Sequence, residues 1–127
     1  MQTEATGTFE IKMGPQTDAS HAAGRMTIDK TYSGDLVGTG TGQMISKRTE
    51  SGAAMYFAIE EFEGALRGMP GGFTLMHQGK MSKEASSLNI IILEGSGYGK
   101  LEGITGSYNI IRNESGHAYE LTYDFAG

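Results

Sequence analysis

The chain has 127 residues and holds only three histidines, so each one can be judged as a candidate for acid–base chemistry. His77 alternates with Leu75 along one apolar segment, and His117 alternates with Tyr119 along another. Both histidines are therefore expected on an inward strand face or at its rim. Because imidazole titrates near neutral pH, either ring is a candidate general base or a donor that orients a ligand. The alternative is a hydrogen-bonded histidine that only fills the core.

A second candidate group is the glutamate cluster Glu60, Glu61 and Glu63. Because successive side chains of a strand point to opposite faces, one of Glu60 and Glu61 must point inward. Burial would raise the pKa of such a carboxyl group and suit it to acid or base catalysis. The alternative is that these carboxylates are solvated or salt-bridged, with Arg67 as a nearby cation.

Other kinds of site receive little support from the residues. The chain has no cysteine, and its histidines and acids lack the compact spacing of a zinc motif. The glycine clusters at 38–42 and 95–99 lie within or lead into strand-like segments, whereas a phosphate loop leads into a helix. We therefore expect no metal and no other cofactor.

Charge and apolar patterning limit the partners. The formal net charge is −5 with a pI near 5.1, and no basic stripe is present, so nucleic acid is not expected as a partner. The longest apolar run is Ile90 to Leu93, far short of the ~20 residues of a membrane span. No signal peptide is visible, and with the lack of cysteine this predicts a cytoplasmic protein.

The elements that must position these residues are short strands, because apolar and polar side chains alternate with period two between glycine-bearing turns. The segment at 53–66 has some helical composition but keeps the strand pattern. A chain this rich in strands removes its open edges by closing the sheet. We predict one domain over residues 1–127, an all-β antiparallel barrel, closed or nearly closed. Its eight strands are expected near 6–13, 25–32, 36–45, 53–62, 72–81, 87–93, 101–112 and 117–125, with a polar loop at 14–24.

Two of these strands are apolar on both faces, although a barrel interior covers only one face. In the fourth strand one face carries Met55, Phe57 and Ile59 and the other carries Tyr56, Ala58 and Phe62. In the sixth strand one face carries Leu88, Ile90 and Ile92 and the other carries Ile91 and Leu93. Exposed apolar patches of this kind usually mark interfaces, so we predict a homo-oligomer, most simply a dimer. Parity alone predicts one shared buried face for Phe9, Ile11, Met26, Ile28, Phe73, Leu75, Ile104, Tyr108, Leu121, Tyr123 and Phe125.

Five blocks follow one another in order along the chain: GDLVG (34–38), IE (59–60), GFTLMHQGKM (72–81), GSGYGKLEGITG (95–106) and HAYELTY (117–123). In these blocks the chain resembles the bacterial DUF3224 family, whose barrel is similar to that of allene oxide cyclase. The resemblance implies an eight-stranded antiparallel barrel, often a homo-oligomer, with no established activity. One departure is Met69, which follows Gly68 where the family often has arginine. The positions that match the family's recurring pattern, and are the candidate ligand-binding residues, are Glu60, His77, Gln78, His117, Tyr119 and Tyr123.

Three functions remain open on the sequence. The first is binding of a small, largely apolar molecule inside the barrel. The second is a cofactor-free isomerase or cyclase that acts on such a ligand, with Glu60 or His77 as the catalytic group. The third is a structural or interaction role with a filled core. The sequence leaves the presence of catalysis undecided.

Overall fold

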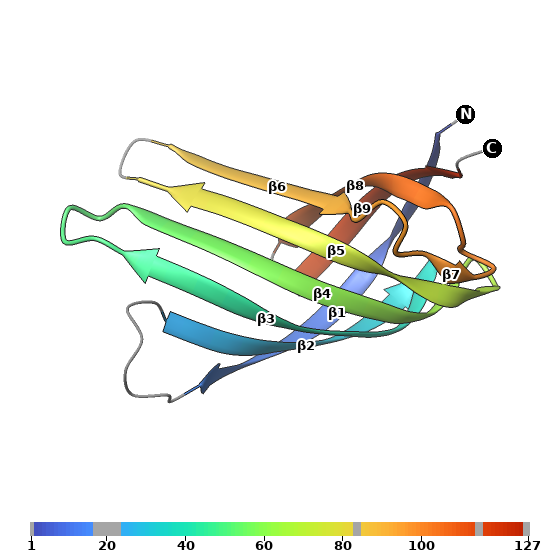
Figure 1. Cartoon of the computed structure of the whole chain (residues 1–127), viewed down its shortest axis with the longest axis horizontal. Coiled ribbons are helices and arrows are strands. Elements are labelled where there is room, and N and C mark those ends of the chain that lie inside the picture. The colour runs from blue at the N-terminus through green and yellow to red at the C-terminus, as the bar shows by residue number, and fades with distance from the viewer. Residues whose placement is uncertain (1, 17–23, 83–84, 114–115, 126–127) are drawn as a thin grey trace.

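The computed structural model describes residues 2–16, 24–82, 85–113 and 116–125, and these residues form strands and turns (Figure 1). Within those ranges no helix is long and apolar enough to cross a membrane. Alternation of β-branched or aromatic residues with polar ones produces the long strands, and glycine or polar turns end them. The strands are β1 (Thr3–Gln16), β2 (Gly24–Gly34), β3 (Leu36–Arg48), β4 (Ala54–Leu66), β5 (Met69–Met81), β6 (Ser86–Ile92), β7 (Tyr98–Gly99), β8 (Ile104–Asn113) and β9 (Gly116–Phe125).

Eight of these strands close into an antiparallel barrel. The sheet order is β4-β3-β2-β1-β9-β8-β6-β5, and β4 also pairs with β5, which joins the two ends of the sheet. The two-residue strand β7 adds to one end of β5. The predicted all-β barrel is confirmed, and so is a strand for the segment with helical composition, which is β4. The predicted seventh strand was wrong at its start, because residues 100–103 form a turn and β8 begins at Ile104.

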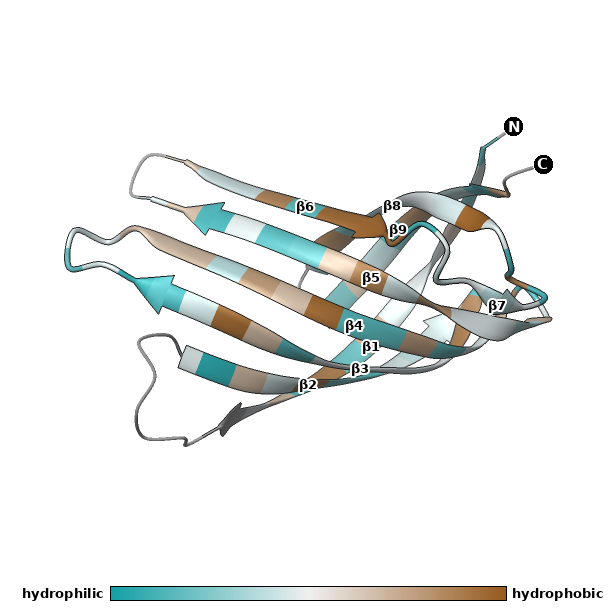
Figure 2. Ribbon diagram, viewed as in Figure 1, coloured by the Kyte–Doolittle hydropathy of each residue, from teal (hydrophilic) through white to brown (hydrophobic). Residues whose placement is uncertain are grey.

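The barrel has two unlike ends. The β3–β4 and β5–β6 hairpins project together at one end, called the open end below (Figure 1). At the opposite end, called the closed end, lie the β2–β3 and β4–β5 turns, both chain termini and the connection that carries β7. Figure 2 shows apolar and polar segments alternating along the projecting strands.

The core fills the closed end. Side chains from the strands pack there around Leu101, which belongs to the turn before β8 and is fully buried. The parity prediction is confirmed: Ile11, Met26 and Phe125 are half-buried and the other eight members of the set are buried. The core cluster consists of Ala5, Phe9, Tyr32, Leu36, Phe62, Leu66, Phe73, Leu75, Ile90, Ile92, Leu101, Ile104, Tyr108, Tyr119, Leu121 and Tyr123.

The glycines at 38–42 serve close packing of strands. Gly38 on β3 is the cross-strand neighbour of Gly64 on β4, and a Cβ atom on either residue would overlap the backbone of the other strand. Gly38 also has a φ of 145°, which side-chain-bearing residues rarely adopt. The interpretation of this cluster as strand glycines rather than a phosphate loop is confirmed, because it lies inside β3.

Candidate functional site

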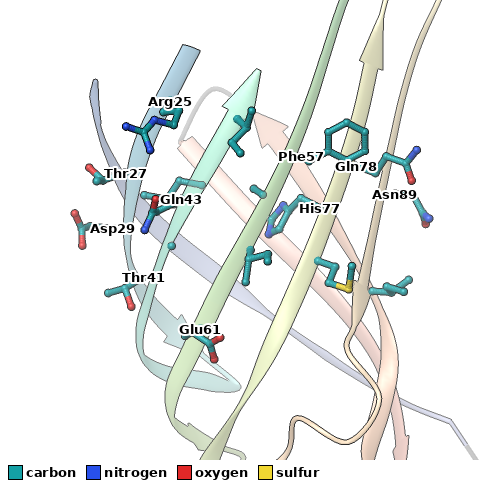
Figure 3. Close-up of a pocket in the computed structure, with 17 residues that line it drawn as sticks. Arg25, Thr27, Asp29, Thr41, Gln43, Phe57, Glu61, His77, Gln78 and Asn89 are labelled. Carbon is teal, nitrogen blue, oxygen red and sulfur yellow. The ribbon is translucent and has the colours of Figure 1, made fainter. Parts of the chain in front are cut away.

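A hollow lies outside the barrel, on the outer face of β2 to β6 (Figure 3). Its volume is about 1040 Å³. Apolar side chains such as Phe57 and Ile59 line it together with polar ones such as Gln43, and Figure 3 shows Arg25 and Asp29 along β2 at one side. We call it the outer hollow. Its position differs from the predicted site, which was the barrel interior.

The barrel interior holds a group of polar side chains that we call the central polar cluster: Lys30 and Tyr32 from β2, Glu60 from β4, His77 from β5 and Tyr108 from β8. Strand alternation puts each of them inward, among apolar neighbours of the same parity. All five are buried. The prediction that one of the two adjacent glutamates points inward is confirmed, and Glu60 is that residue.

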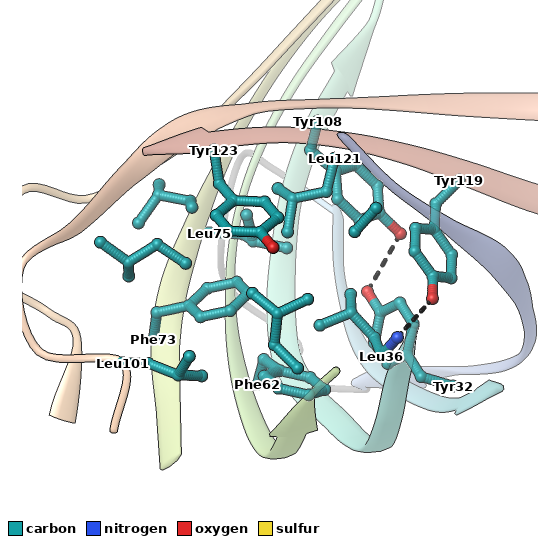
Figure 4. Close-up of a cluster of buried hydrophobic side chains, with 14 of the residues drawn as sticks. Tyr32, Leu36, Phe62, Phe73, Leu75, Leu101, Tyr108, Tyr119, Leu121 and Tyr123 are labelled. Carbon is teal, nitrogen blue, oxygen red and sulfur yellow. Dashed lines mark hydrogen bonds between the residues drawn. The ribbon is translucent and has the colours of Figure 1, made fainter. Parts of the chain in front are cut away.

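Glu60 is the centre of the cluster. The Lys30 ammonium donates to Glu60 Oε1 over 2.8 Å, and His77 Nε2 lies 3.0 Å from the same oxygen. The Tyr32 hydroxyl donates to Oε2 over 2.5 Å, and it lies 3.0 Å from the Tyr108 hydroxyl, a contact drawn in Figure 4. Both carboxylate oxygens are therefore paired, as a buried charge requires.

Aromatic rings surround the cation of this cluster. Lys30 Nζ lies 4.5 Å from the centre of the Phe9 ring and 5.4 Å from that of Tyr108, within the range of cation–π attraction. His117 stacks on the far side of this arrangement, with its ring centre 5.2 Å from that of Phe9. The lysine charge is thus stabilised by Glu60 and by ring faces together.

Electrostatics keeps Glu60 ionised. Burial alone would raise the pKa of its carboxyl group, but the hydrogen bond with His77 and the charge of Lys30 outweigh burial and lower this pKa to about 2. The predicted raised pKa was wrong, because the sequence does not reveal that a cation shares the site. Burial and the negative charge of Glu60 raise the pKa of Tyr32, so its hydroxyl stays a donor. At neutral pH Glu60 therefore has no proton to donate to a substrate.

The other candidate residues lie apart from Glu60. Gln78 is exposed on the outer face and lines the outer hollow, and His117 is half-buried. The Tyr119 hydroxyl accepts from the Leu36 amide over 2.7 Å, and Tyr123 is buried in the core. The structure thus brings together Glu60 and His77 among the six predicted residues.

Arg67 does not pair with the glutamate cluster. Its guanidinium lies 3.5 Å from the Asp35 carboxylate and donates to the Glu4 carbonyl over 2.6 Å, at the closed end. The turn places it there: Arg67 lies between β4 and β5 with a φ of 49°, and its amide donates to the Asp35 carbonyl over 2.7 Å. The alternative in which Arg67 pairs with this glutamate cluster is therefore wrong.

Sequence reasoning missed Lys30, Tyr32 and Tyr108 as members of the site. A signal was present, since Lys30 falls at an inward position between Ile28 and Tyr32. A charged side chain at an inward position is rare unless it is paired. That position predicts a buried partner of opposite charge, although it does not identify Glu60.

The open end above the cluster has an apolar lining that is rich in methionine. Met26 and Met44 are cross-strand neighbours with inward parity and are half-buried, and the Tyr56 ring lies over Gly79. Met13 and Leu88 continue this lining and remain more than two-fifths exposed. Methionine is flexible and polarizable, and it is common at surfaces that adapt to varied apolar ligands. We call these residues the open-end lining.

Among the described residues, no group of three or more histidine, cysteine, aspartate or glutamate side chains is placed to hold a metal ion. The side chains of the central polar cluster are a lysine, a single carboxylate, an imidazole and two phenols. The chemistry of this group is that of hydrogen bonding and charge.

The comparisons with known proteins agree with this architecture. The profile of the family described as "Protein of unknown function (DUF3224)" matches residues 5–123. A crystal structure of a protein of unknown function from the DUF3224 family, from Shewanella oneidensis MR-1, is similar to this chain with a TM-score of 0.93 and 34% sequence identity, covering 100% of both chains. No curated protein matches the sequence. The chain belongs to the DUF3224 family.

Proposed function

We propose that the barrel binds a small, largely apolar molecule at its open end, with Lys30 and His77 as the polar contacts at the floor of the site. The observation that carries this proposal is a buried ionic cluster inside a barrel whose open end has an apolar, incompletely covered lining. The apolar body of the ligand would lie against the open-end lining, and one polar end would reach the floor.

The energetics of the cluster support a binding role. A buried ion pair recovers its desolvation cost only with excellent geometry, and apolar residues of similar volume often stabilise a fold as well or better. Stability alone is therefore a weak reason to place Lys30 and Glu60 at the centre of a barrel. Recognition of a polar ligand group is a stronger reason.

The order of burial indicates which members of the cluster would meet a ligand. Glu60 is 0% exposed and Tyr32 and Tyr108 are 2% exposed, whereas Lys30 is 4% and His77 is 6% exposed. His77 is the most exposed member, and Lys30 is the cation that binds the same carboxylate oxygen. Both offer N–H donors, so a carboxylate, carbonyl or hydroxyl group is the chemistry that suits this floor.

The charge state favours binding over proton transfer. An ionised carboxylate with a pKa near 2 is neither a proton donor at neutral pH nor a strong base. Glu60 is better suited to hold Lys30 and His77 in place. The lack of cysteine agrees with a reducing compartment, and we place this function in the cytoplasm.

The test uses the dye 1-anilinonaphthalene-8-sulfonate, which combines an apolar body with one anionic group. We expect saturable binding of one dye per chain, seen as enhanced fluorescence. Met44→Gln removes apolar contact from the open-end lining and should weaken binding by about tenfold, which corresponds to ~1.4 kcal/mol. The matched control is Met55→Gln, in the same hairpin but 40% exposed on the outer side, and it should bind as the natural protein does.

Two further measurements make the proposal falsifiable. Native mass spectrometry of freshly purified protein should show an added mass that His77→Gln reduces. Dye binding that is unchanged in Met44→Gln would contradict the proposed place. Absence of both dye binding and added mass would overturn the binding role in favour of a structural barrel with a filled core.

A further inference from the structure

The outer face of β2 to β6 carries a contiguous apolar patch that the barrel leaves uncovered. We call it the outer apolar face: Ile45 on β3, Phe57 and Ile59 on β4, Met76 on β5 and Ile91 on β6. The register makes Ile45 the neighbour of Phe57, Ile59 the neighbour of Met76, and Met76 the neighbour of Ile91. Figure 2 shows apolar segments on β3, β4 and β6 within this region.

This patch is a contiguous group of large apolar side chains that are about half exposed. Its five side chains are between 41% and 55% exposed. Half-exposed side chains of this size leave on the order of 400 Å² of apolar surface uncovered, in the range that marks interaction sites. A standard interface buries ~800 Å² per partner, so the polar border must contribute about as much area as the apolar patch. The outer hollow lies over the same residues, so the face is also recessed.

We propose that this face binds the same face of a second copy of the chain, related by a two-fold axis that runs across the strands. The axis follows the row Thr27, Gln43, Ile59, Met76 and Ile91, whose members are successive cross-strand neighbours. Rotation about this row places the same row of the second copy over it. The strands of the two copies then run in opposite directions across the interface. Gln43 is suited to the axis because its amide both donates and accepts.

Charge complementarity selects this arrangement. Arg25 and Asp29 lie on β2, two residues to either side of Thr27, and both line the outer hollow. Reversal of the strands therefore brings Arg25 of one copy over Asp29 of the other, and the pairing occurs twice. Phe57 would lie over the aliphatic stem of Glu61, whose carboxylate is held by the Thr74 hydroxyl at 2.8 Å.

The chain itself offers little to cover the face. The polar stretch at 14–24 is the alternative cover, and part of it lies outside the described residues. Its composition is Gly, Pro, Gln, Thr, Asp, Ala, Ser and His, without a large aliphatic or aromatic side chain. In the proposed arrangement a second copy stacks Ile59, Met76 and Ile91 on their own counterparts. Two-fold homodimers are also the commonest closed assemblies.

The experiment is sedimentation equilibrium between about 1 and 100 µM. We expect a mass twice that of the 13.5-kDa chain. Ile59→Glu places like charges on the axis and should raise the dissociation constant by at least about 100-fold. The matched control, Val37→Glu, alters a side chain that is 58% exposed on β3 outside the patch and should leave the dimer intact. Circular dichroism checks that both variants fold.

A charge swap tests the two-fold arrangement. Arg25→Glu and Asp29→Arg should each weaken the dimer, and the double variant should restore it, because the swapped charges meet again across the axis. A double variant weaker than either single variant would overturn this arrangement. A chain of monomeric mass at every concentration would overturn the dimer. The dye test described above reports on the open-end lining through Met44→Gln. Its failure would leave the proposed dimer of the outer apolar face unaffected.

Discussion

Lys30 and Glu60 form an ion pair that is almost completely buried. Removal of either charge therefore leaves the other one buried without a partner. In Glu60→Gln the ammonium of Lys30 stays buried without its carboxylate partner. Breaking a buried pair in this way costs ~3–5 kcal/mol of unfolding free energy. We expect the melting temperature to fall by on the order of 10 °C or more in thermal unfolding followed by circular dichroism.

Glu61→Gln is the control for this residue, since Glu61 is exposed on the opposite face of the same strand. It should change the free energy by less than about 1 kcal/mol. The double variant Lys30→Met/Glu60→Gln removes the unpaired charge and should recover a large part of the loss. Equal losses for Glu60→Gln and Glu61→Gln would contradict the paired cluster.

The lowered pKa of Glu60 also predicts a response to acid. Its pKa is about 2 in the folded protein against an ordinary value of 4.5, so the folded state binds the proton less tightly than the unfolded state. The stability that Glu60 contributes is therefore fully present above pH ~4.5 and is lost as the pH falls toward 2. Urea unfolding from pH 7 to pH 2 should show this loss in the natural protein and a shallower loss in Glu60→Gln. Parallel pH profiles would contradict an ionised Glu60.

At the scale of the elements, β3 must pass close to the cluster, and Gly40 permits it. A Cβ atom at Gly40 would overlap the Glu60 carboxylate and lie 3.0 Å from the Tyr32 ring. Gly40→Ala should therefore cost ~1–3 kcal/mol of unfolding free energy, measured by urea denaturation. Gly24→Ala on β2 meets its nearest atom at 3.5 Å and should change stability little. Similar losses in both variants would show that the effect is not specific to the cluster.

At the scale of the whole molecule, the barrel depends on contacts between residues far apart in the sequence. The Tyr119 hydroxyl on β9 accepts from the Leu36 amide and donates to the Ser33 carbonyl over 3.2 Å, which fixes the β2–β3 turn against the last strand. Tyr119→Phe leaves the Leu36 amide buried without its acceptor. The expected cost is ~1–3 kcal/mol in urea denaturation. Tyr98→Phe, on the exposed strand β7, is the control, and an equal loss there would contradict this role.

The sequence by itself determined the class of fold and the inward side of most strands. Period-two alternation and glycine turns depend only on local backbone geometry, so they predicted the barrel, the strand at β4 and the inward position of His77. They also predicted that one of Glu60 and Glu61 points inward, without deciding which. Alternation also predicted that β4 and β6 are apolar on both faces, and the structure leaves the outer of the two faces exposed.

Only the tertiary structure decided which polar groups meet. Lys30 and Glu60 are 30 residues apart, and Tyr32 and Tyr108 are 76 apart, so their contacts follow from the register of strands that close the barrel. That register also placed Arg67 beside Asp35 and held the pKa of Glu60 low rather than high. Parity specifies the face on which a side chain lies, whereas a partner and a charge state depend on distances across the barrel, which alternation along one strand does not contain.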